Sequence, residues 1–285
     1  MDIKTIGVIG AGLMGNGIAQ VLAQAGYTVM MRDIEDRFVE NGLKTIKGNL
    51  GRLVQKEKMT QKEYDAILGR INGTIKLDDL KPCELIIEAI LENKELKKSL
   101  YLELSKLCDP KVIFASNTSS LSITEIASFT NRPKTVIGLH FFNPVPVMQL
   151  VEIIRGLETT DEAFQVVKEV VDKTGKTGIE IKDSPGFVVN RILIPMLNEA
   201  AFTLMERVAS KEDIDNGMKL GCNHPIGPIA LMDLIGLDTA LAVMETFYTE
   251  FGDSKYRPCP LLKQMVRAGN LGRKTGKGFY DYNKK

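Results

Sequence analysis

A glycine motif near the amino terminus constrains the fold of this chain more than any other feature. Gly10, Gly12 and Gly15 follow the apolar run 3–9 and open the apolar run 13–25. This pattern predicts a strand, a tight turn and a helix whose free backbone N–H groups favour an anion. The first glycine permits the turn, the second lets a pyrophosphate approach the backbone, and the third lets the helix pack closely on the strand. The motif therefore predicts a dinucleotide site.

A second requirement of such a site is met where the next apolar strand, 27–31, ends. Asp33 lies there, 23 residues after Gly10. Its carboxylate can bind both hydroxyls of an adenosine ribose and repels a 2′-phosphate, which favours NAD, while the adjacent Arg32 leaves NADP possible. The sequence thus predicts a set of cofactor-binding residues: Gly10, Ala11, Gly12, Leu13, Met14, Gly15 and Asp33.

The rest of the first half alternates short apolar runs with helical patterns. Strands are predicted at 3–9, 27–31, 84–89, 111–115, 135–140, 149–154 and 178–181, and helices at 13–25, 92–107 and 161–173, with two more in 36–68. This alternation predicts an α/β fold with a Rossmann-type doubly wound, mostly parallel sheet. Strand patterns nearly disappear beyond Ser184-Pro185-Gly186, and helices are predicted at 187–207, 211–220 and 228–251. We expect an NAD-binding domain over 1–185 and an all-helical domain over 186–285.

Two histidines are present, and His140 is the better candidate for chemistry. It ends strand 135–140, and ligands of an open parallel sheet bind beyond the carboxyl ends of the strands. Glu152 is a lone carboxylate in the apolar run 150–154, and a buried charge needs a partner. A carboxylate on one ring nitrogen stabilises the imidazolium that forms when the other nitrogen takes a proton. A core histidine beside a solvent-reaching glutamate is the alternative. His224, in a loop before Pro225, is assigned no chemistry.

Two polar segments could contact a substrate. The loop Ser116–Ser120 follows strand 111–115 at the same sheet edge, and its hydroxyls could hold a substrate oxygen or cap a helix before Leu121. Asn190 lies one turn into the first helix of the second domain. Its amide could donate to a substrate carbonyl.

The charge pattern excludes some partners and suggests another. The net charge of +1 argues against nucleic acid or an anionic membrane as the main partner. Residues 37–62 nevertheless hold seven lysines and arginines against two glutamates, a local excess of five positive charges. This segment could receive a polyphosphate ligand, or it could be a solvated helix face.

Cysteine usage and the amino terminus predict a cytoplasmic protein. The four cysteines match no metal-binding spacing, and their low density is typical of reduced thiols. The chain enters an apolar strand without a signal-peptide pattern. Its longest uncharged stretch, 135–151, contains a histidine, an asparagine and two prolines, so no membrane span is expected.

Over its whole length the chain resembles the 3-hydroxyacyl-CoA dehydrogenase family, and most of all its short, free-standing bacterial members that act on 3-hydroxybutyryl-CoA. The motifs that carry the resemblance are the glycine motif, Arg32-Asp33-Ile34, the segments Ala115–Leu121, His140–Pro144 and Ser184–Arg191, and the tail Leu271–Tyr280. The resemblance implies an NAD-dependent enzyme that interconverts acetoacetyl-CoA and (S)-3-hydroxybutyryl-CoA. It also implies a homo-oligomer, dimeric or larger, assembled through the helical domain, which closes the substrate cleft.

The resemblance also implies roles for particular residues. His140 would be the general acid/base and Glu152 its partner, while Ser119 and Asn190 would position the 3-oxygen and the thioester of the substrate. The dinucleotide would be contacted by Glu92, Lys97, Asn143 and Lys274, and CoA by Lys56. A dehydrogenase of a free hydroxy acid and a non-enzymatic NAD-binding protein are the alternatives. The basic segment 37–62 opposes the first, and the complete catalytic set opposes the second.

Overall fold

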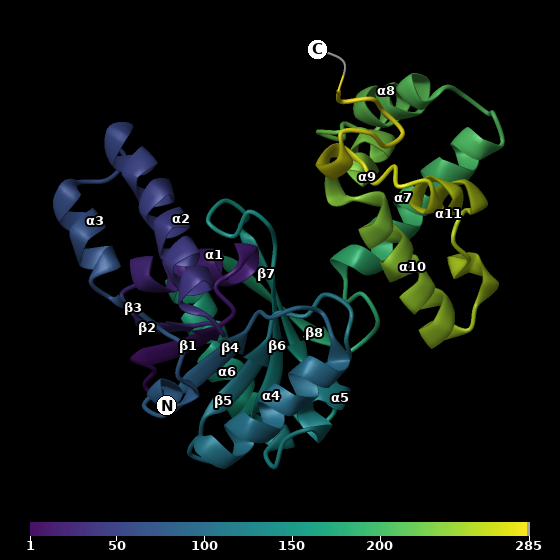
Figure 1. The fold of residues 1–285 in the computed structure, drawn as a ribbon. Helices are drawn as coiled ribbons and strands as arrows, with labels where there is room; N and C mark the ends of the chain where they lie inside the picture. The colour runs from purple at the N-terminus through teal and green to yellow at the C-terminus, as the bar shows by residue number, and fades with distance from the viewer. Residues whose placement is uncertain (284–285) are drawn as a thin grey trace. The chain divides into compact units, whose positions relative to one another are not determined.

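The computed structural model describes residues 1–283 and divides into two compact units, which are described separately below (Figure 1). The first unit is Met1–Ser184, and the second begins at Pro185. This division falls one residue before the boundary expected from the sequence. The first unit holds all the named strands, and the second is built from helices.

The first unit is organised around one sheet of eight strands in the order β3-β2-β1-β4-β5-β6-β7-β8. Every neighbouring pair is parallel except β6 and β7, which confirms the mostly parallel, Rossmann-type sheet. The strands are β1 (Thr5–Ile9), β2 (Thr28–Arg32), β3 (Ile71–Thr74), β4 (Leu85–Glu88), β5 (Ile113–Ser116), β6 (Val136–Phe141), β7 (Leu150–Arg155) and β8 (Thr177–Lys182).

The strand order creates a crevice beside β1. The chain runs outward from β1 through β2 to β3 and then returns to place β4 on the other side of β1. Connections that leave neighbouring strands in opposite directions open a crevice beyond the carboxyl ends of those strands. The glycine turn follows β1 at this point, so the topology puts the predicted cofactor loop in the crevice.

Helices cover both faces of the sheet (Figure 1). They are α1 (Leu13–Gln24), α2 (Asp36–Gln55), α3 (Gln61–Leu68), α4 (Lys94–Leu107), α5 (Ile123–Ser128) and α6 (Asp161–Lys173), with the 3₁₀ turns Leu77–Leu80 and Pro133–Thr135. Buried side chains of α1, α2, α3 and α6 form one core with the strand residues facing them, among them Val8, Ile87 and Leu139. On the opposite face, the Tyr101 hydroxyl of α4 donates to the Ala115 carbonyl of β5. The α2–α3 pair extends away from the sheet, as Figure 1 shows.

Local capping explains where several of these helices begin. The Thr60 hydroxyl accepts from the Glu63 N–H while the Glu63 carboxylate accepts from the Thr60 N–H, which forms a capping box at α3. The side-chain oxygen of Asn93 caps α4, and the Ser122 hydroxyl caps α5. The helix cap that the sequence allowed among Ser116–Ser120 is therefore wrong, because α5 begins two residues after Leu121 and is capped by Ser122.

The second unit contains five helices among its described residues. They are α7 (Val189–Met205), α8 (Lys211–Gly221), α9 (Pro228–Ile235), α10 (Leu237–Phe251) and α11 (Pro260–Arg267), with 3₁₀ turns at Ser254–Tyr256 and Arg273–Thr275. The single helix predicted over 228–251 is wrong, because Gly236 adopts a φ of 103° and separates α9 from α10. Pro195 lies inside α7, which continues past it. Facing side chains of α7, α9, α10 and α11 form a separate core.

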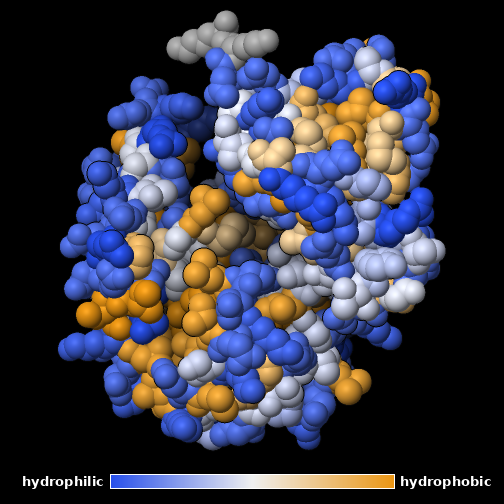
Figure 2. Space-filling model, turned by 45° about the vertical axis from the view of Figure 1, so that its right-hand side comes forward, coloured by the Kyte–Doolittle hydropathy of each residue, from blue (hydrophilic) through white to orange (hydrophobic). Residues whose placement is uncertain are grey.

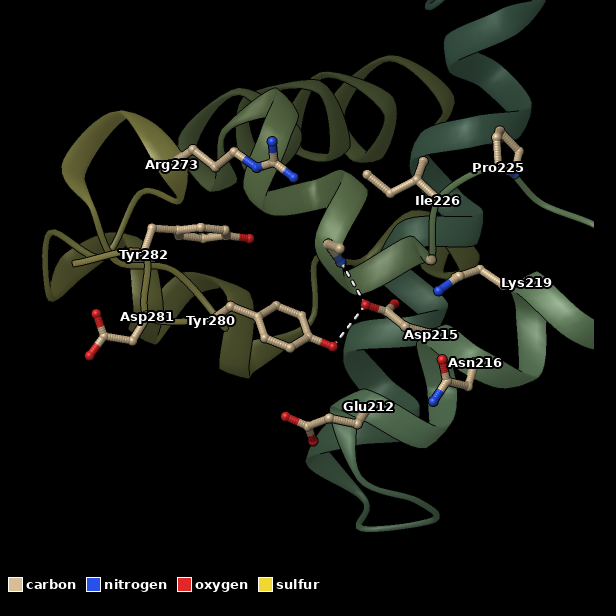
Figure 3. Close-up of a pocket in the computed structure, with 12 residues that line it drawn as sticks. Glu212, Asp215, Asn216, Lys219, Pro225, Ile226, Arg273, Tyr280, Asp281 and Tyr282 are labelled. Atoms are coloured by element: carbon tan, nitrogen blue, oxygen red, sulfur yellow. Dashed lines mark hydrogen bonds between the residues drawn. The ribbon is translucent and has the colours of Figure 1, made fainter. Parts of the chain in front are cut away.

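Two buried aspartates tie the end of the chain to this helical unit. Asp233 accepts hydrogen bonds from the Phe279 and Tyr280 N–H groups and from the Tyr282 hydroxyl, at 2.9, 2.9 and 3.0 Å. Asp215 accepts from the Tyr280 hydroxyl and from two backbone N–H groups at the start of α9. Figure 3 shows Asp215 and the tyrosines lining a cavity of about 440 Å³. Both oxygens of the Asp215 carboxylate accept hydrogen bonds from the protein itself, so we assign Asp215 a structural role.

Apolar side chains also reach the surface. Figure 2 shows one face, on which hydrophobic residues interrupt a mainly hydrophilic surface. Within residues 1–283, no helix is both long enough and apolar enough to cross a membrane.

Candidate active site

The loop after β1 has the conformation that its glycines predict. Gly10 has a φ of 100°, and its N–H donates to the Arg32 carbonyl at 2.8 Å. A Cβ on Gly15 would lie 1.7 Å from the Gly10 carbonyl oxygen, so only glycine lets α1 approach the strand this closely. No atom lies within 4 Å of a Cβ built on Gly12, which leaves the backbone open to a ligand there. Met14 packs partly against the core, and Leu13 is exposed.

Asp33 lies directly against this loop. One carboxylate oxygen accepts from the Ala11 N–H and the other from the Ile34 N–H, both at 2.7 Å. The carboxylate is thereby fixed beside the glycine turn, and its contact with a ribose stays a prediction. The neighbouring Arg32 donates through Nε to the Ile75 carbonyl at 3.3 Å, which anchors its guanidinium toward β3.

A cavity of about 590 Å³ opens between these elements. Its walls come from the glycine loop, the end of β2, the start of α2, residues 89–91 after β4 and one side of α4. They include the apolar side chains Ile34, Phe38, Ile90, Leu91, Leu96 and Leu100. Apolar walls beside a fixed carboxylate suit a flat base attached to a ribose. The residues present therefore fit the adenosine part of NAD.

The structure brings His140 and Glu152 together. The two residues are paired across the antiparallel strands β6 and β7. The His140 Nδ1 lies 2.6 Å from a Glu152 carboxylate oxygen, Glu152 is fully buried, and the Phe142 ring packs 4.5 Å from the imidazole. Because side chains on a strand alternate between faces, both point to the face covered by α4 and α5. The imidazole is thus largely buried, with Nδ1 held by a carboxylate.

A second buried charge cluster lies on the same face of the sheet. Glu88 ends β4 and is fully buried, and Lys97 on α4 is only 1% exposed. The Lys97 ammonium lies 2.6 Å from Glu88 and 3.3 Å from Glu92, and the Ser116 hydroxyl donates to Glu88 at 2.7 Å. Both carboxylates share one ammonium, which offsets the cost of burying the charges.

Glu92 connects this cluster to the serine loop after β5. Its carboxylate accepts from the N–H groups of Ser119 and Ser120 at 2.9 and 3.1 Å and from the Thr118 and Ser120 hydroxyls. Burial raises the pKa of the Glu92 carboxyl, but Lys97 and these hydrogen bonds outweigh it and hold the pKa below its ordinary value. The carboxylate is therefore charged at neutral pH.

The serine loop is also tied to the strand that carries His140. The Asn117 side-chain oxygen accepts from the Phe141 N–H at 2.9 Å, and the Asn117 N–H donates to the Glu88 carbonyl at 2.7 Å. Ser119, two residues further on, is half-exposed. The loop and the histidine therefore share one hydrogen-bonded frame.

The remaining predicted residues are placed as follows. Asn143 is exposed in the connection between β6 and β7, and Lys56 is exposed where α2 ends. In the second unit, Asn190 lies in the first turn of α7, and the Lys274 ammonium pairs with Asp238 at 2.6 Å. Their contacts with a ligand stay predictions.

Sequence reasoning missed Glu88 and the bonding role of Asn117. Glu88 follows Leu85-Ile86-Ile87, so it carries the same signal, a lone carboxylate in an apolar strand, that singled out Glu152. For Asn117 no such signal exists, because its partner, the Phe141 N–H, is set by the order of strands.

The fold and the site together define a class of protein. A doubly wound sheet with a glycine turn, an aspartate after the second strand and a buried histidine–carboxylate pair at the sheet edge where the parallel strands end is the arrangement of a nicotinamide-dependent dehydrogenase.

Comparisons with known proteins agree with this class and narrow it. The sequence model for "3-hydroxyacyl-CoA dehydrogenase, NAD binding domain" matches residues 5–184, and that for the C-terminal domain of the same family matches residues 186–282. The chain therefore belongs to the 3-hydroxyacyl-CoA dehydrogenase family, as the resemblance indicated, and is an NAD-dependent oxidoreductase.

Relatives match over the full chain. A probable 3-hydroxybutyryl-CoA dehydrogenase of Bacillus subtilis (strain 168) is 53% identical over 285 residues, covering 100% of this chain and 99% of the relative. A 3-hydroxybutyryl-CoA dehydrogenase of Bradyrhizobium diazoefficiens is 52% identical over 280 residues, covering 98% and 96%. The crystal structure of (S)-3-hydroxybutyryl-CoA dehydrogenase from Ralstonia eutropha has a TM-score of 0.98 and 55% identity, covering 99% of this chain and 100% of that one.

Proposed function

We propose that the protein interconverts acetoacetyl-CoA and (S)-3-hydroxybutyryl-CoA with NAD(H), using His140 as the general acid/base. The contact between His140 Nδ1 and Glu152, at 2.6 Å, is the observation that carries this proposal. It holds the imidazole at the same edge of the sheet as the glycine loop. The names of the full-length relatives support the choice of substrate.

The chain's own residues would act on the proton and on the substrate. Glu152 keeps the proton of the imidazole on Nδ1 and stabilises the imidazolium, so Nε2 exchanges a proton with the 3-oxygen of the substrate. When bound, NADH supplies the hydride for C3. In that direction protonated His140 donates to the oxygen, and in the other direction neutral His140 accepts from the hydroxyl. We assign Ser119 to the 3-oxygen and Asn190 to the thioester.

NAD is the expected cofactor because Asp33 stands where a 2′-phosphate would have to lie. A carboxylate there repels the phosphate and favours the ribose hydroxyls. Arg32 would have to leave its bond with the Ile75 carbonyl to compensate. We also propose that Glu92, Lys97, Asn143 and Lys274 form the outer part of this cofactor site, as the resemblance implies.

CoA recognition is assigned to the basic segment 37–62. Lys56 is exposed at the end of α2, on the helix pair that extends from the sheet (Figure 1). CoA carries several phosphate charges, and a basic surface raises the local concentration of such a ligand. A free hydroxy acid would have no use for this surface.

One assay tests the proposed function against its alternatives. Oxidation of NADH and of NADPH is followed with 3-ketoacyl-CoA substrates of about four to sixteen carbons and with free acetoacetate. We expect acetoacetyl-CoA with NADH to be the preferred pair. Equal use of free acetoacetate would favour a hydroxy-acid dehydrogenase, and no oxidation with any acyl-CoA would favour a non-enzymatic NAD-binding protein.

We further propose a cytoplasmic homo-oligomer that assembles through the helical unit. This unit exposes Ile192, Val208 and Leu220 at 68, 71 and 85%, which suits a surface buried by another subunit. The four cysteines are free thiols, as expected in a reducing compartment. Light scattering on the purified protein would measure the assembly, and a monomeric mass would contradict it.

A further inference from the structure

Glu92 makes an unusual number of contacts with one short loop. A single oxygen of its carboxylate accepts from two N–H groups, those of Ser119 and Ser120, and from the hydroxyls of Thr118 and Ser120. These donors belong to three consecutive residues, about 26 to 28 positions away in the chain. The side chain of Glu92 therefore bonds most of the polar groups of this loop.

The carboxylate is in turn held from behind. Its second oxygen lies 3.3 Å from the Lys97 ammonium, which is itself 2.6 Å from the fully buried Glu88. Lys97 is 1% exposed, so burial and two carboxylates immobilise its ammonium. The Glu92 side chain is 36% exposed, and its contact with this buried ion pair restrains its carboxylate beside the loop.

One oxygen of the Glu92 carboxylate thus faces four donors, while the other faces the Lys97 ammonium. Because it is partly exposed, the Glu92 side chain also borders the solvent from which a cofactor would approach. The contact with the serine loop is therefore compatible with the place proposed for Glu92 in the cofactor site.

We propose that Glu92, braced by Lys97, is a positioning residue that fixes the backbone at Ser119 and so sets where the Ser119 hydroxyl meets the substrate oxygen. This inference rests on the proposed function, because it needs Ser119 to contact the 3-oxygen. Asn117 supports the same arrangement from the other side, since its side chain binds the Phe141 N–H next to His140.

A double-mutant cycle tests the inference. Glu92→Gln, Ser119→Ala and the double variant are compared in turnover of acetoacetyl-CoA, and binding of NADH is measured separately by fluorescence titration. We expect Glu92→Gln to lower kcat roughly 10-fold, since small displacements of a positioned group slow turnover. In the Ser119→Ala background, Glu92→Gln should change kcat less than about twofold. The effects of two substitutions on kcat do not add when both residues act through one contact.

Controls separate positioning from loss of fold or of cofactor. Glu95→Gln, on the exposed side of α4, should leave kcat and NADH binding unchanged, and circular dichroism checks each variant for folding. Glu92→Asp keeps the charge beside Lys97 but shortens the reach to residues 118–120, so it should lower kcat as well.

Several outcomes overturn the inference. They are equal effects of Glu92→Gln in both backgrounds, full activity of Glu92→Asp, or weaker NADH binding with unchanged kcat, which a role in the cofactor site alone predicts. A wild-type protein that does not oxidise NADH with acetoacetyl-CoA overturns the proposed function as well, so the two failures are distinguishable.

Discussion

Buried charges at the sheet edge where the parallel strands end are the chemically informative residues of this protein. Glu88 and Glu152 are both fully buried, and each has a cationic or titratable partner at 2.6 Å. Ionised groups are kept in such positions only when they are paired and hydrogen-bonded. One pair, with Lys97, holds a loop in place. The other, with His140, is the candidate for proton transfer.

Removing the imidazole of His140 tests the role of the His140–Glu152 pair in proton transfer. His140→Ala should lower kcat by roughly 10²–10⁴-fold, the usual contribution of general acid/base catalysis. Glu152→Gln should lower kcat in the same sense, because an amide cannot stabilise the imidazolium. Both are measured in steady-state turnover of acetoacetyl-CoA, with NADH affinity as the control. Near-normal turnover of a folded, NADH-binding His140→Ala protein would contradict the assignment.

The lowered pKa of Glu92 predicts a pH effect on stability. Its pKa is lower in the folded than in the unfolded state, so the contribution of Glu92 to folding is present above the unfolded value and is lost as pH falls through the folded value. The stability difference between wild type and Glu92→Gln should therefore shrink as pH falls from about 7 to about 3. Urea unfolding at several pH values measures it, and a constant difference would contradict the prediction.

At the scale of elements, the connections between strands carry the specific functions. The turn after β1 and the loop after β5 both lie at carboxyl ends of parallel strands. Short apolar strands were predictable because their residues are buried on both faces. β3 was not predicted, since its sequence Ile71-Asn72-Gly73-Thr74 is short and polar and it pairs only because β2 presents an edge.

The α2–α3 pair is the element expected to recognise CoA. Lys56→Glu should raise KM for acetoacetyl-CoA several-fold, and the difference should diminish as ionic strength rises, because exposed charges are screened by salt. NADH affinity should not change. Lys111→Glu, before β5 at the opposite end of the strand, is the matched control. Equal effects of both substitutions would indicate a general charge effect.

At the scale of the molecule, each unit has a core of its own and its own buried polar anchors. In the second unit these anchors join residues far apart in the chain, since Asp233 on α9 binds the N–H groups of Phe279 and Tyr280. The same contact explains two glycines: a Cβ on Gly278 would lie 2.0 Å from an Asp233 carboxylate oxygen, and one on Gly272 would lie 2.2 Å from its carbonyl oxygen.

Breaking this anchor should destabilise the protein. Asp233→Asn places an NH₂ group against backbone N–H donors and should cost about 1–3 kcal/mol, the penalty for a buried donor without an acceptor. Denaturant unfolding measures the change in free energy. Glu245→Gln, in an exposed ion pair with Lys263, is the control and should change stability by less than about 1 kcal/mol. Equal losses would show that Asp233 contributes no more than a surface charge.

The sequence by itself determined the features that depend on neighbours along the chain. The glycine turn, the position of Asp33 after the second strand, most strands and the change to helices near residue 185 follow from local periodicity and from conformations that only glycine adopts easily. Gly236 shows the limit of this reasoning, because an apolar helical pattern runs through it and only its φ of 103° divides α9 from α10.

Only the tertiary structure decided which polar residues meet. His140 and Glu152 are 12 residues apart and face each other because β6 and β7 pair antiparallel in one register. Glu92 reaches Ser119 because β4 and β5 are neighbours in the sheet. The sequence suggested the first pair but left an alternative open, and it gave no sign of the second. Such contacts depend on strand order and register, which are properties of the whole sheet and not of a local pattern.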